Sequence, residues 1–261
     1  MRPPAVKNTS RVDGPVQKYG VHDKGIMPPR VHVVVFCTHR DGMYSLLESD
    51  ARRHGISLVV LGWGTKWVSF FEKLRAVHEY TRGVHEDDLV VVIDAFDTRI
   101  RGGYAQIVEQ WRGLGAPDVV FSKDPSLFPR YIINRVFGGS LNAGMYMGRA
   151  GPLAEIQQEA MRFEAECKKD DQCAFNAVAR GQRIAVDSQR TLFYNLGYSE
   201  RGRDLSQVES KAVFYGFPGS VTFTRVVRAA GEYLPFFLPE ISALVCLLVA
   251  IILYRRYRRD A

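Results

Sequence analysis

Two aspartates at the end of an apolar run are the residues in this sequence best suited to bind a metal ion. Asp94 and Asp97 follow residues 89–93, whose composition is typical of a strand buried on both faces. Carboxylates held this close repel each other, and a divalent cation removes the repulsion. Because oxygen ligands suit Mg2+ and Mn2+, the pair predicts a metal-bridged nucleotide-diphosphate site at a strand end. The alternative is an acidic turn, in which aspartate is common.

Further polar side chains lie at the ends of other predicted elements. Thr38 ends the first predicted strand, where a nucleotide base or ribose would bind in a Rossmann-like sheet. Lys73, on a predicted helix, could reach a phosphate or could be an ordinary solvated lysine. Asn142 follows a glycine-containing turn, where a backbone can approach a ligand closely. Asp170 and Asp171 form a second acidic pair, which could instead cap the helix that follows.

The elements that would position these residues alternate between strands and helices. The strands are predicted at 31–37, 57–61, 89–93 and 118–122, and the helices at 42–54, 67–80 and 104–114. This order, with its short connections, predicts an α/β fold of the Rossmann-like type, in which helices flank a mostly parallel sheet. Later strands are predicted at 140–148, 184–186, 192–195 and 212–215, and later helices at 153–167 and 173–179.

The net charge of +7 comes from the two ends of the chain. Residues 1–30 form a basic lead-in rich in proline and glycine, which we expect to be disordered. Residues 31–254 hold 25 basic and 25 acidic residues. The central part therefore has no net charge, and the sequence gives no support for a nucleic-acid partner.

Cysteine spacing and missing motifs exclude several classes of protein. No Cys-x-x-Cys pair is present, so a zinc site is not expected. Cys167 and Cys173 could form a disulfide or could be unpaired residues of a helix. The chain also lacks a GxGxxG fingerprint, a P-loop lysine motif, an HExxH pair and a Gly-x-Ser-x-Gly elbow. These absences argue against dinucleotide oxidoreductases, P-loop NTPases, zincins and hydrolases with that elbow.

Residues 233–254 are predicted to form a transmembrane helix. They include an almost wholly apolar run, and the basic tail 255–261 follows. At ~1.5 Å per residue this segment would cover roughly 33 Å, enough for a hydrocarbon core of about 30 Å. A buried terminal helix and an interfacial helix are the alternatives.

The predicted span implies a single-pass protein of the ER or Golgi membranes, with the globular domain at 31–232. The two arguments on its orientation conflict. The positive-inside rule places the arginines in the cytosol and the domain in a lumen. The lack of a visible signal peptide favours a tail anchor, with the domain in the cytosol.

Taken together, the motifs resemble the glycosyltransferase domain of the procollagen lysyl hydroxylase/glucosyltransferase family, which has a GT-A type fold. The resemblance extends from about residue 31 to residue 219 and depends on the order and spacing of several short motifs. They are Thr38, Glu72-Lys73-Leu74-Arg75, Asp94-Ala95-Phe96-Asp97, Leu141-Asn142-Ala143-Gly144, Asp170-Asp171-Gln172, and the segment from Asp187 through Phe193 and Asn195 to Leu196.

The resemblance implies a metal-dependent glycosyltransferase that moves a hexose, glucose or galactose, from a UDP-sugar to an acceptor hydroxyl. The metal would be Mn2+ or Mg2+. The acceptor would be a protein or glycan, such as hydroxylysine or galactosyl-hydroxylysine of collagen-like chains.

The resemblance also implies roles for the candidate residues. Asp94 and Asp97 would bind the metal, and Thr38, Lys73 and Phe96 would hold the nucleotide and its diphosphate. The sugar and the acceptor hydroxyl would be contacted by Asn142, Asp170 and Asp171.

The chain departs from the family near the end of the domain. The family has a His/Asn-Gly-Asn-Gly-Pro segment that closes on the metal, and Tyr215-Gly216-Phe217-Pro218-Gly219 stands here instead. Tyrosine is a poor Mn2+ ligand at neutral pH because its pKa is ~10. The third protein ligand is therefore left open, and water or donor phosphates could fill its place.

This departure favours an alternative function, a membrane-anchored and catalytically degenerate module that binds nucleotide-sugar or glycan without turnover. A nucleotidyltransferase is a third candidate, because it shares the metal chemistry of a paired-acid site.

Overall fold

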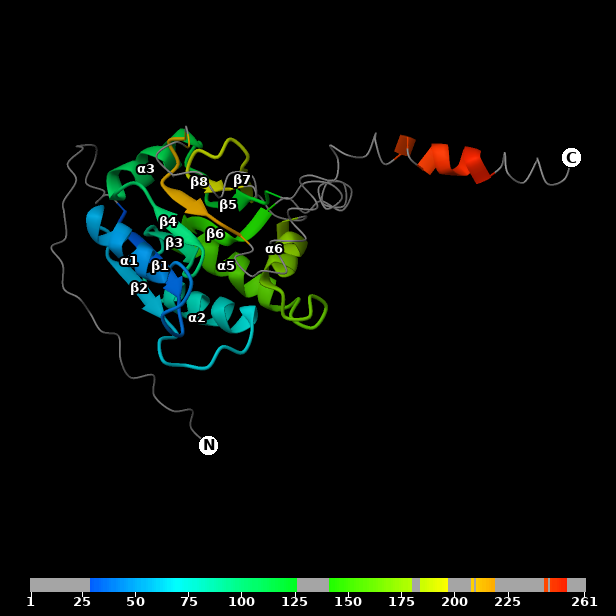
Figure 1. The fold of residues 1–261 in the computed structure, drawn as a ribbon. Helices are drawn as coiled ribbons and strands as arrows, with labels where there is room; N and C mark the ends of the chain where they lie inside the picture. The colour runs from blue at the N-terminus through cyan, green and yellow to red at the C-terminus, as the bar shows by residue number, and fades with distance from the viewer. Residues whose placement is uncertain are drawn as a thin grey trace, which may run out of the picture.

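The computed structural model describes residues 29–125, 141–179, 184–196, 208, 210–218, 242–243 and 245–252. Within these residues the chain folds into a six-stranded sheet flanked by helices, with a second sheet of three short strands (Figure 1). The strands are β1 (Val31–Phe36), β2 (Leu58–Leu61), β3 (Leu89–Asp94), β4 (Thr98–Ile100), β5 (Val119–Lys123), β6 (Leu141–Arg149), β7 (Ala185–Asp187), β8 (Phe193–Asn195) and β9 (Phe214–Gly216). The helices are α1 (Tyr44–Arg53), α2 (Phe70–Arg82), α3 (Tyr104–Gly113), α5 (Ala150–Met161) and α6 (Asp171–Ala179).

The main sheet has the strand order β2-β1-β3-β6-β5-β7. Every strand in it runs parallel to the others except β6, which is antiparallel to both of its neighbours. The prediction of a mostly parallel sheet with flanking helices is therefore confirmed. Since β6 runs backwards, its first residues lie at the same edge of the sheet as the last residues of β1 and β3.

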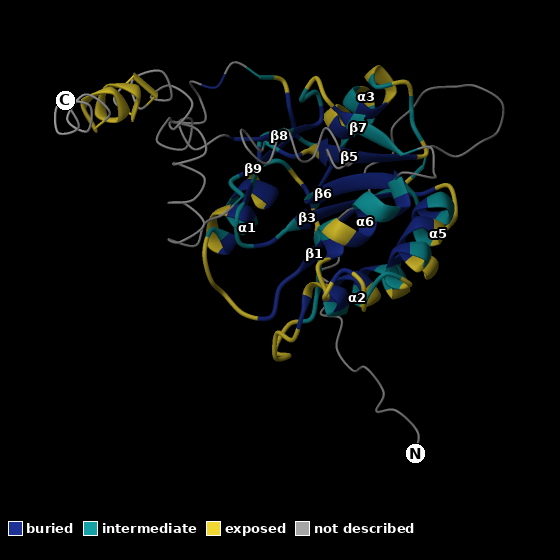
Figure 2. Ribbon diagram, turned by 90° about the vertical axis from the view of Figure 1, so that its right-hand side faces the viewer, coloured by how far each residue is buried: buried dark blue, intermediate teal, exposed yellow. Residues whose placement is uncertain are grey.

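The sheet is buried on both faces because its strands alternate two sets of apolar side chains. In β3, Val91 and Ile93 pack with α1 and α3, whereas Val90 and Val92 pack on the opposite face with α2, α5 and α6. Figure 2 shows buried residues along the strands and exposed residues on the outer sides of the helices. The two-sided burial explains why β3 is a continuous β-branched run rather than an alternating one.

Most predicted helices and strands are present, with shifted ends. The helix predicted at 153–167 is too long, because α5 ends at Met161 and the chain then turns. Lys168 and Lys169 adopt left-handed φ angles of 49° and 65° in that turn. Cys167 and Cys173, which enclose the turn's end, form a disulfide.

The second sheet has the order β4-β9-β8 and was only partly predicted. Strand β4 was missed, because a three-residue strand is too short to show a periodic pattern. Its Arg99 forms an ion pair with the buried Asp50 of α1, which joins the second sheet to the main domain. Strand β9 is joined to the acidic loop by a 2.7 Å hydrogen bond from the Phe217 N–H to the Asp97 carbonyl.

The prediction of a transmembrane helix at 233–254 is contradicted. Among the described residues, no helix is long and apolar enough to cross a membrane. The helical residues described in this segment are 242–243 and 245–252. The expected location as a single-pass protein of the ER or Golgi membranes depended on that helix and is contradicted with it.

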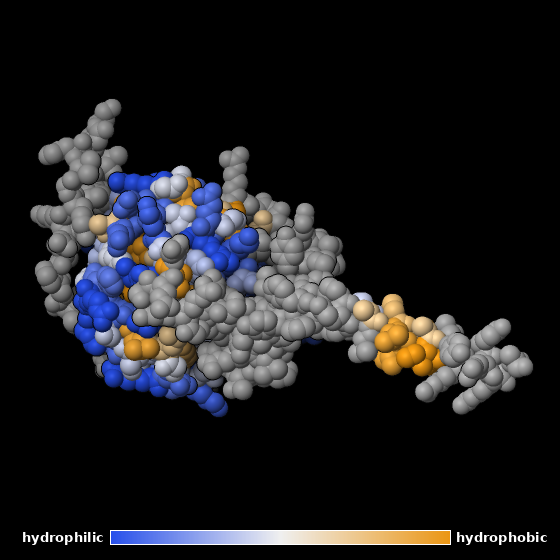
Figure 3. Space-filling model, turned by 45° about the horizontal axis from the view of Figure 1, so that its top comes forward, coloured by the Kyte–Doolittle hydropathy of each residue, from blue (hydrophilic) through white to orange (hydrophobic). Residues whose placement is uncertain are grey.

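The apolar composition of the segment is nevertheless real. Its exposed side chains form the orange patch in Figure 3; they include Val245, Leu247, Leu248, Val249, Ile251 and Ile252. Composition indicated an apolar helix, and residues 242–243 and 245–252 are helical. The predicted tail 255–261 and all but the last two residues of the lead-in 1–30 lie outside the described residues.

Replacing Phe175 by alanine should lower the free energy of unfolding by about 3–5 kcal/mol, because the change leaves a cavity in the core. Phe175 is fully buried in α6, with ring centroids 4.9 Å from Phe121 and 5.3 Å from Tyr146. Urea denaturation followed by circular dichroism measures the change. Phe70 is the matched control: its side chain is exposed, so Phe70→Ala should cost about 1 kcal/mol or less. Equal losses in the two variants would contradict the packing described.

Candidate functional site

The predicted acid pair lies beside a small cavity at the carboxyl edge of the main sheet. Phe36 of β1 pairs with Asp94 of β3, and Ile93 lies opposite Met145 of β6, so three strands converge there. The cavity has a volume of about 20 Å³. Such a space holds one water molecule or one ion, not a nucleotide-sugar. It is lined by Asp94, Asp97, Thr98, Asn142, Gly144, Met145, Asn195, Gly216 and Pro218.

Two glycines let side-chain oxygens approach the backbone at this cavity. A Cβ added at Gly144 would lie 2.8 Å from Asp94 Oδ2 and 2.9 Å from Asn142 Oδ1. A Cβ added at Gly216 would lie 2.3 Å from Asn195 Oδ1. Larger residues at either position would displace these oxygens, so both glycines are part of the site.

A buried lysine holds one of the two acids in place. Lys73 of α2 lies with its ammonium 3.1 Å from Asp94 Oδ1 and 2.8 Å from Asp171 Oδ2. Burial alone lowers the pKa of Lys73, but attraction to Asp171 and Asp94 outweighs it, and the pKa is raised above its ordinary value. Lys73 is thus a cation at neutral pH, and the solvated-lysine alternative is wrong.

The carboxylates near the cavity come from two places. Asp94 and Asp97 line the cavity, and Asp171 lies behind it in the ion pair with Lys73. The side chain of Asp94 is 35% exposed, so it is accessible to a ligand from the cavity side.

The second acidic pair divides between two different environments. Asp171 is buried and forms the ion pair with Lys73. Asp170 is exposed, and its Oδ1 accepts hydrogen bonds from the backbone N–H groups of Gln172 and Cys173, at 2.9 Å and 3.3 Å. Asp170 therefore caps α6. Of the two aspartates, Asp170 is the one whose carboxylate is exposed to solvent.

Asn142 is engaged within the protein. Its Oδ1 accepts a hydrogen bond from the Gly144 N–H at 3.0 Å, and its Nδ2 donates to Gln172 Oε1 at 3.2 Å. Gln172 in turn donates to Asp124 Oδ2 at 3.0 Å. These bonds attach the start of β6 to α6 and fix the wall of the cavity.

The residues expected to hold a nucleotide lie on the neighbouring loops. Thr38 is buried just after β1, and its hydroxyl is hydrogen-bonded to His39 Nδ1 at 2.8 Å. Phe96 is half-buried, and its ring centroid lies 5.6 Å from that of His39. The loop after β2 adds the exposed aromatic residues Trp63 and Trp67, which were not among the predicted site residues.

Tyr215 does not face the cavity. It is fully buried in β9, its hydroxyl donates a hydrogen bond to the Ser210 carbonyl at 3.1 Å, and its ring stacks on Tyr194. The residues of this segment that line the cavity are Gly216 and Pro218. The phenol is therefore in the core, in keeping with its poor suitability as a metal ligand.

The oxygen atoms at the cavity are suited to a metal ion. Within the described part of the chain, no three His, Cys, Asp or Glu side chains form a metal-binding group. The cavity nevertheless combines the carboxylates of Asp94 and Asp97 with the amide of Asn195. Both amide hydrogens of Asn195 are donated, to Ser122 Oγ at 3.1 Å and to the Lys123 carbonyl at 2.9 Å, which leaves its oxygen for another partner. Carboxylate and amide oxygens suit Mg2+ and Mn2+.

Asn195 was part of a family motif in the sequence but was not predicted as a site residue. Its position in a three-residue strand gave no signal of the cavity, which forms only when β8 pairs with β9.

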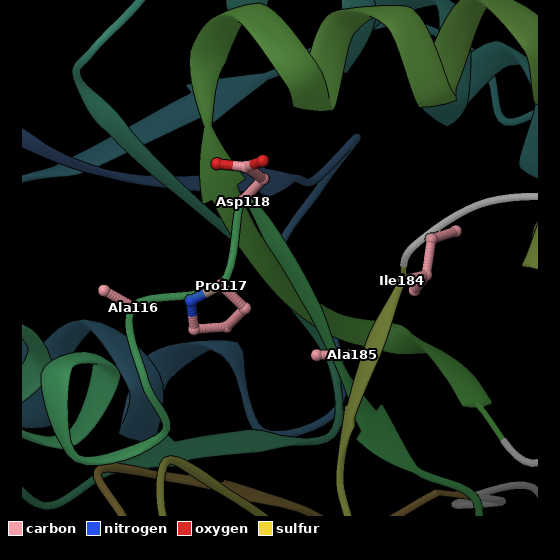
Figure 4. Close-up of a pocket in the computed structure, with 5 residues that line it drawn as sticks. All are labelled: Ala116, Pro117, Asp118, Ile184 and Ala185. Carbon is pink, nitrogen blue, oxygen red and sulfur yellow. The ribbon is translucent and has the colours of Figure 1, made fainter.

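A larger hollow lies elsewhere and has little chemistry. Its volume is about 450 Å³, and Figure 4 shows the residues that line it: Ala116, Pro117, Asp118, Ile184 and Ala185. These residues lie at the start of β5 and β7, which is the opposite edge of the sheet from the acid pair. Asp118 is the one charged residue in this lining, so we do not assign the active site here.

Comparison with known proteins agrees with this fold. The chain is similar to the crystal structure of a glycosyltransferase involved in the glycosylation of the major capsid of PBCV-1, with a TM-score of 0.51 and 13% identity over 77% of this chain and 100% of that chain. At this identity the likeness shows the fold alone. The apo structure of the bifunctional glycosyltransferase WbbM matches with a TM-score of 0.46 and 14% identity, over 75% of this chain and 47% of that chain. No curated protein gave a significant match.

The family model described as the PLOD GT domain, a glycosyltransferase domain, matches residues 28–217, which is more than half of the chain. The protein belongs to this family, and the resemblance drawn from its motifs is confirmed.

Replacing Lys73 by methionine should lower the free energy of unfolding by about 3–5 kcal/mol, because the change leaves a buried carboxylate without its partner. Urea denaturation measures the loss. Lys66→Met is the control: Lys66 is exposed in the loop before α2, and its replacement should change stability by about 0.5 kcal/mol or less. Wild-type stability of Lys73→Met would contradict the ion-pair assignment.

Proposed function

We propose that the protein is a metal-dependent glycosyltransferase that moves a hexose, glucose or galactose, from a UDP-sugar to an acceptor hydroxyl. The main support is the ion-sized cavity with Asp94 and Asp97 on its wall, at the edge where α/β sheets of this type bind ligands. Family membership supports transfer of a sugar, and the two carboxylates on the cavity wall support a divalent cation.

Asp94 and Asp97 would hold Mn2+ or Mg2+, which when bound supplies positive charge to the leaving diphosphate. Lys73 keeps Asp94 oriented through its 3.1 Å contact and adds a second positive charge beneath the diphosphate position. Because this lysine is already paired with two carboxylates, its main task is to position Asp94.

The uridine would be held by the loops after β1 and β3. The half-buried ring of Phe96 offers an aromatic face to the base, and Thr38 anchors the loop by accepting a 2.9 Å hydrogen bond from the Gly64 N–H at its carbonyl. The exposed Trp67 lies on the same side, because its ring centroid is 5.9 Å from that of Phe36, at the end of β1.

The sugar and acceptor would lie near the start of α6. Asp170 presents an exposed carboxylate there and is the group we assign to the acceptor hydroxyl. Asp171 and Asn142 act from behind it, since both are buried and bonded within the protein. By family, the acceptor is a protein or glycan, with hydroxylysine or galactosyl-hydroxylysine of collagen-like chains as the first candidate. The neutral central part of the chain supports no nucleic-acid partner.

A donor panel tests the function. With Mn2+ present, the protein should release UDP from UDP-glucose or UDP-galactose, and EDTA should stop the release. UDP is measured by a coupled luminescence assay. Binding of UDP-sugars without release or transfer would instead support a degenerate binding module. Consumption of nucleoside triphosphates in place of UDP-sugars would indicate a nucleotidyltransferase.

Asp97→Ala should reduce Mn2+-stimulated UDP release by about 100-fold or more, because the loss of a metal ligand removes several kcal/mol of leaving-group stabilisation. The fold should be retained, since Asp97 is only partly buried in a loop. Asp118→Ala is the matched control, because Asp118 lies at the opposite edge of the sheet with a side chain that is 71% exposed. Full metal-stimulated activity in Asp97→Ala would refute the assigned site.

A further inference from the structure

We propose that the side-chain oxygen of Asn195 is the third protein ligand of the metal, in place of the family's closing residue. This inference rests on the proposed function, because it assumes a cation at Asp94 and Asp97. It adds a residue from the second sheet to a site that the sequence placed in the main sheet.

The orientation of the Asn195 amide is fixed by its own hydrogen bonds. Asn195 is 4% exposed, at the end of β8. Both hydrogens of its Nδ2 are donated, to Ser122 Oγ and to the Lys123 carbonyl. The Lys123 carbonyl can only accept, so rotating the amide by 180° would place two oxygens against each other. The oxygen Oδ1 must therefore point away from β5.

That oxygen faces the cavity and accepts no hydrogen bond from a residue that the structure describes. A Cβ built on Gly216 would lie 2.3 Å from it, and Gly216 is itself part of the cavity wall. An amide oxygen with no protein donor is open to a ligand. A cation bound there would also meet the carboxylates of Asp94 and Asp97, which line the same cavity.

The other amide at the cavity is less available. Asn142 Oδ1 already accepts a hydrogen bond from the Gly144 N–H. Tyr215 is excluded because its hydroxyl is bonded to Ser210 on the far side of β9. Among the described residues, Asn195 is thus the neutral oxygen donor that the geometry favours.

Backbone hydrogen bonds hold this arrangement rigidly. Asn195 pairs with Gly216 in the β8–β9 ladder, and the Leu196 N–H donates to the Gly216 carbonyl at 2.9 Å. The next residue, Phe217, donates its N–H to the Asp97 carbonyl at 2.7 Å. The chain segments of Asp97, Gly216 and Asn195 are therefore connected without any flexible side chain, as a preorganised metal site requires.

Two substitutions at Asn195 test whether this residue is a metal ligand or only a structural residue. Asn195→Ala and Asn195→Asp both lose the Nδ2 donors, but only the aspartate keeps an oxygen directed at the cavity. Mn2+ binding by the full chain is measured from the electron paramagnetic resonance signal of free Mn2+. We expect Asn195→Ala to weaken binding about tenfold or more and Asn195→Asp to retain it. Equal weakening in both variants, or none in Asn195→Ala, would overturn the inference.

Controls separate this inference from the proposed function. Tyr215→Phe should leave Mn2+ affinity unchanged, whereas Asp97→Ala should abolish binding. If Asp97→Ala binds Mn2+ normally, the metal site itself is wrong; if only Asn195→Ala does, the third ligand alone is wrong.

A measurement on the wild-type chain covers the case in which the Asn195 variants do not fold. With asparagine labelled by 13C at the side-chain carbonyl, electron–nuclear double resonance should show a 13C coupling to bound Mn2+. Absence of that coupling would also overturn the inference.

Discussion

The ion pair of Lys73 with Asp94 and Asp171 is the interaction on which the site depends. The ammonium group is buried, and it joins three elements that are far apart in the sequence, namely α2, β3 and α6. The Asp171 carboxylate alone would be expensive to bury, and so would the lysine, but the ion pair offsets both costs. The consequence is that Asp94 has a fixed orientation before any ligand binds. A site for a leaving group works best when its charges are preorganised in this way, since no protein rearrangement is then needed during the reaction.

The second sheet supplies part of the wall of the cavity that lies at the edge of the main sheet. Strands β8 and β9 are short, and they would not be stable as an isolated pair. They are held by the core on one side and by the Phe217–Asp97 backbone hydrogen bond on the other. That bond couples the loop that contains Asp97 to the segment that contains Gly216. The cavity is small because Gly144 and Gly216 allow the oxygens to crowd against the backbone. These two glycines therefore account both for the small volume of the cavity and for the side-chain oxygens that line it.

Tyr215 stands where the motif resemblance places a closing residue of the proposed metal site. It is part of the core, stacked on Tyr194, and its hydroxyl has an internal partner. The atoms that line the cavity come from several strands, so β8 can supply an oxygen where β9 supplies none. The orientation of Asn195 offers such an oxygen to the proposed site.

The sequence by itself determined the layered α/β fold, the buried strand β3 and the acid pair at its end, because apolar periodicity and residue type are local properties. It also determined the family, since the spacing of short motifs is preserved in the linear chain. It could not show that Lys73 lies between two carboxylates or that the hydrogen bonds of the Asn195 amide direct its oxygen at the cavity. Those facts depend on which atoms meet after β6 inserts between β3 and β5, and on three-residue strands that have no period of their own. The predicted membrane helix was wrong: composition marks a segment as apolar but does not by itself specify a membrane-spanning helix, and no helix among the described residues is long and apolar enough to cross a membrane.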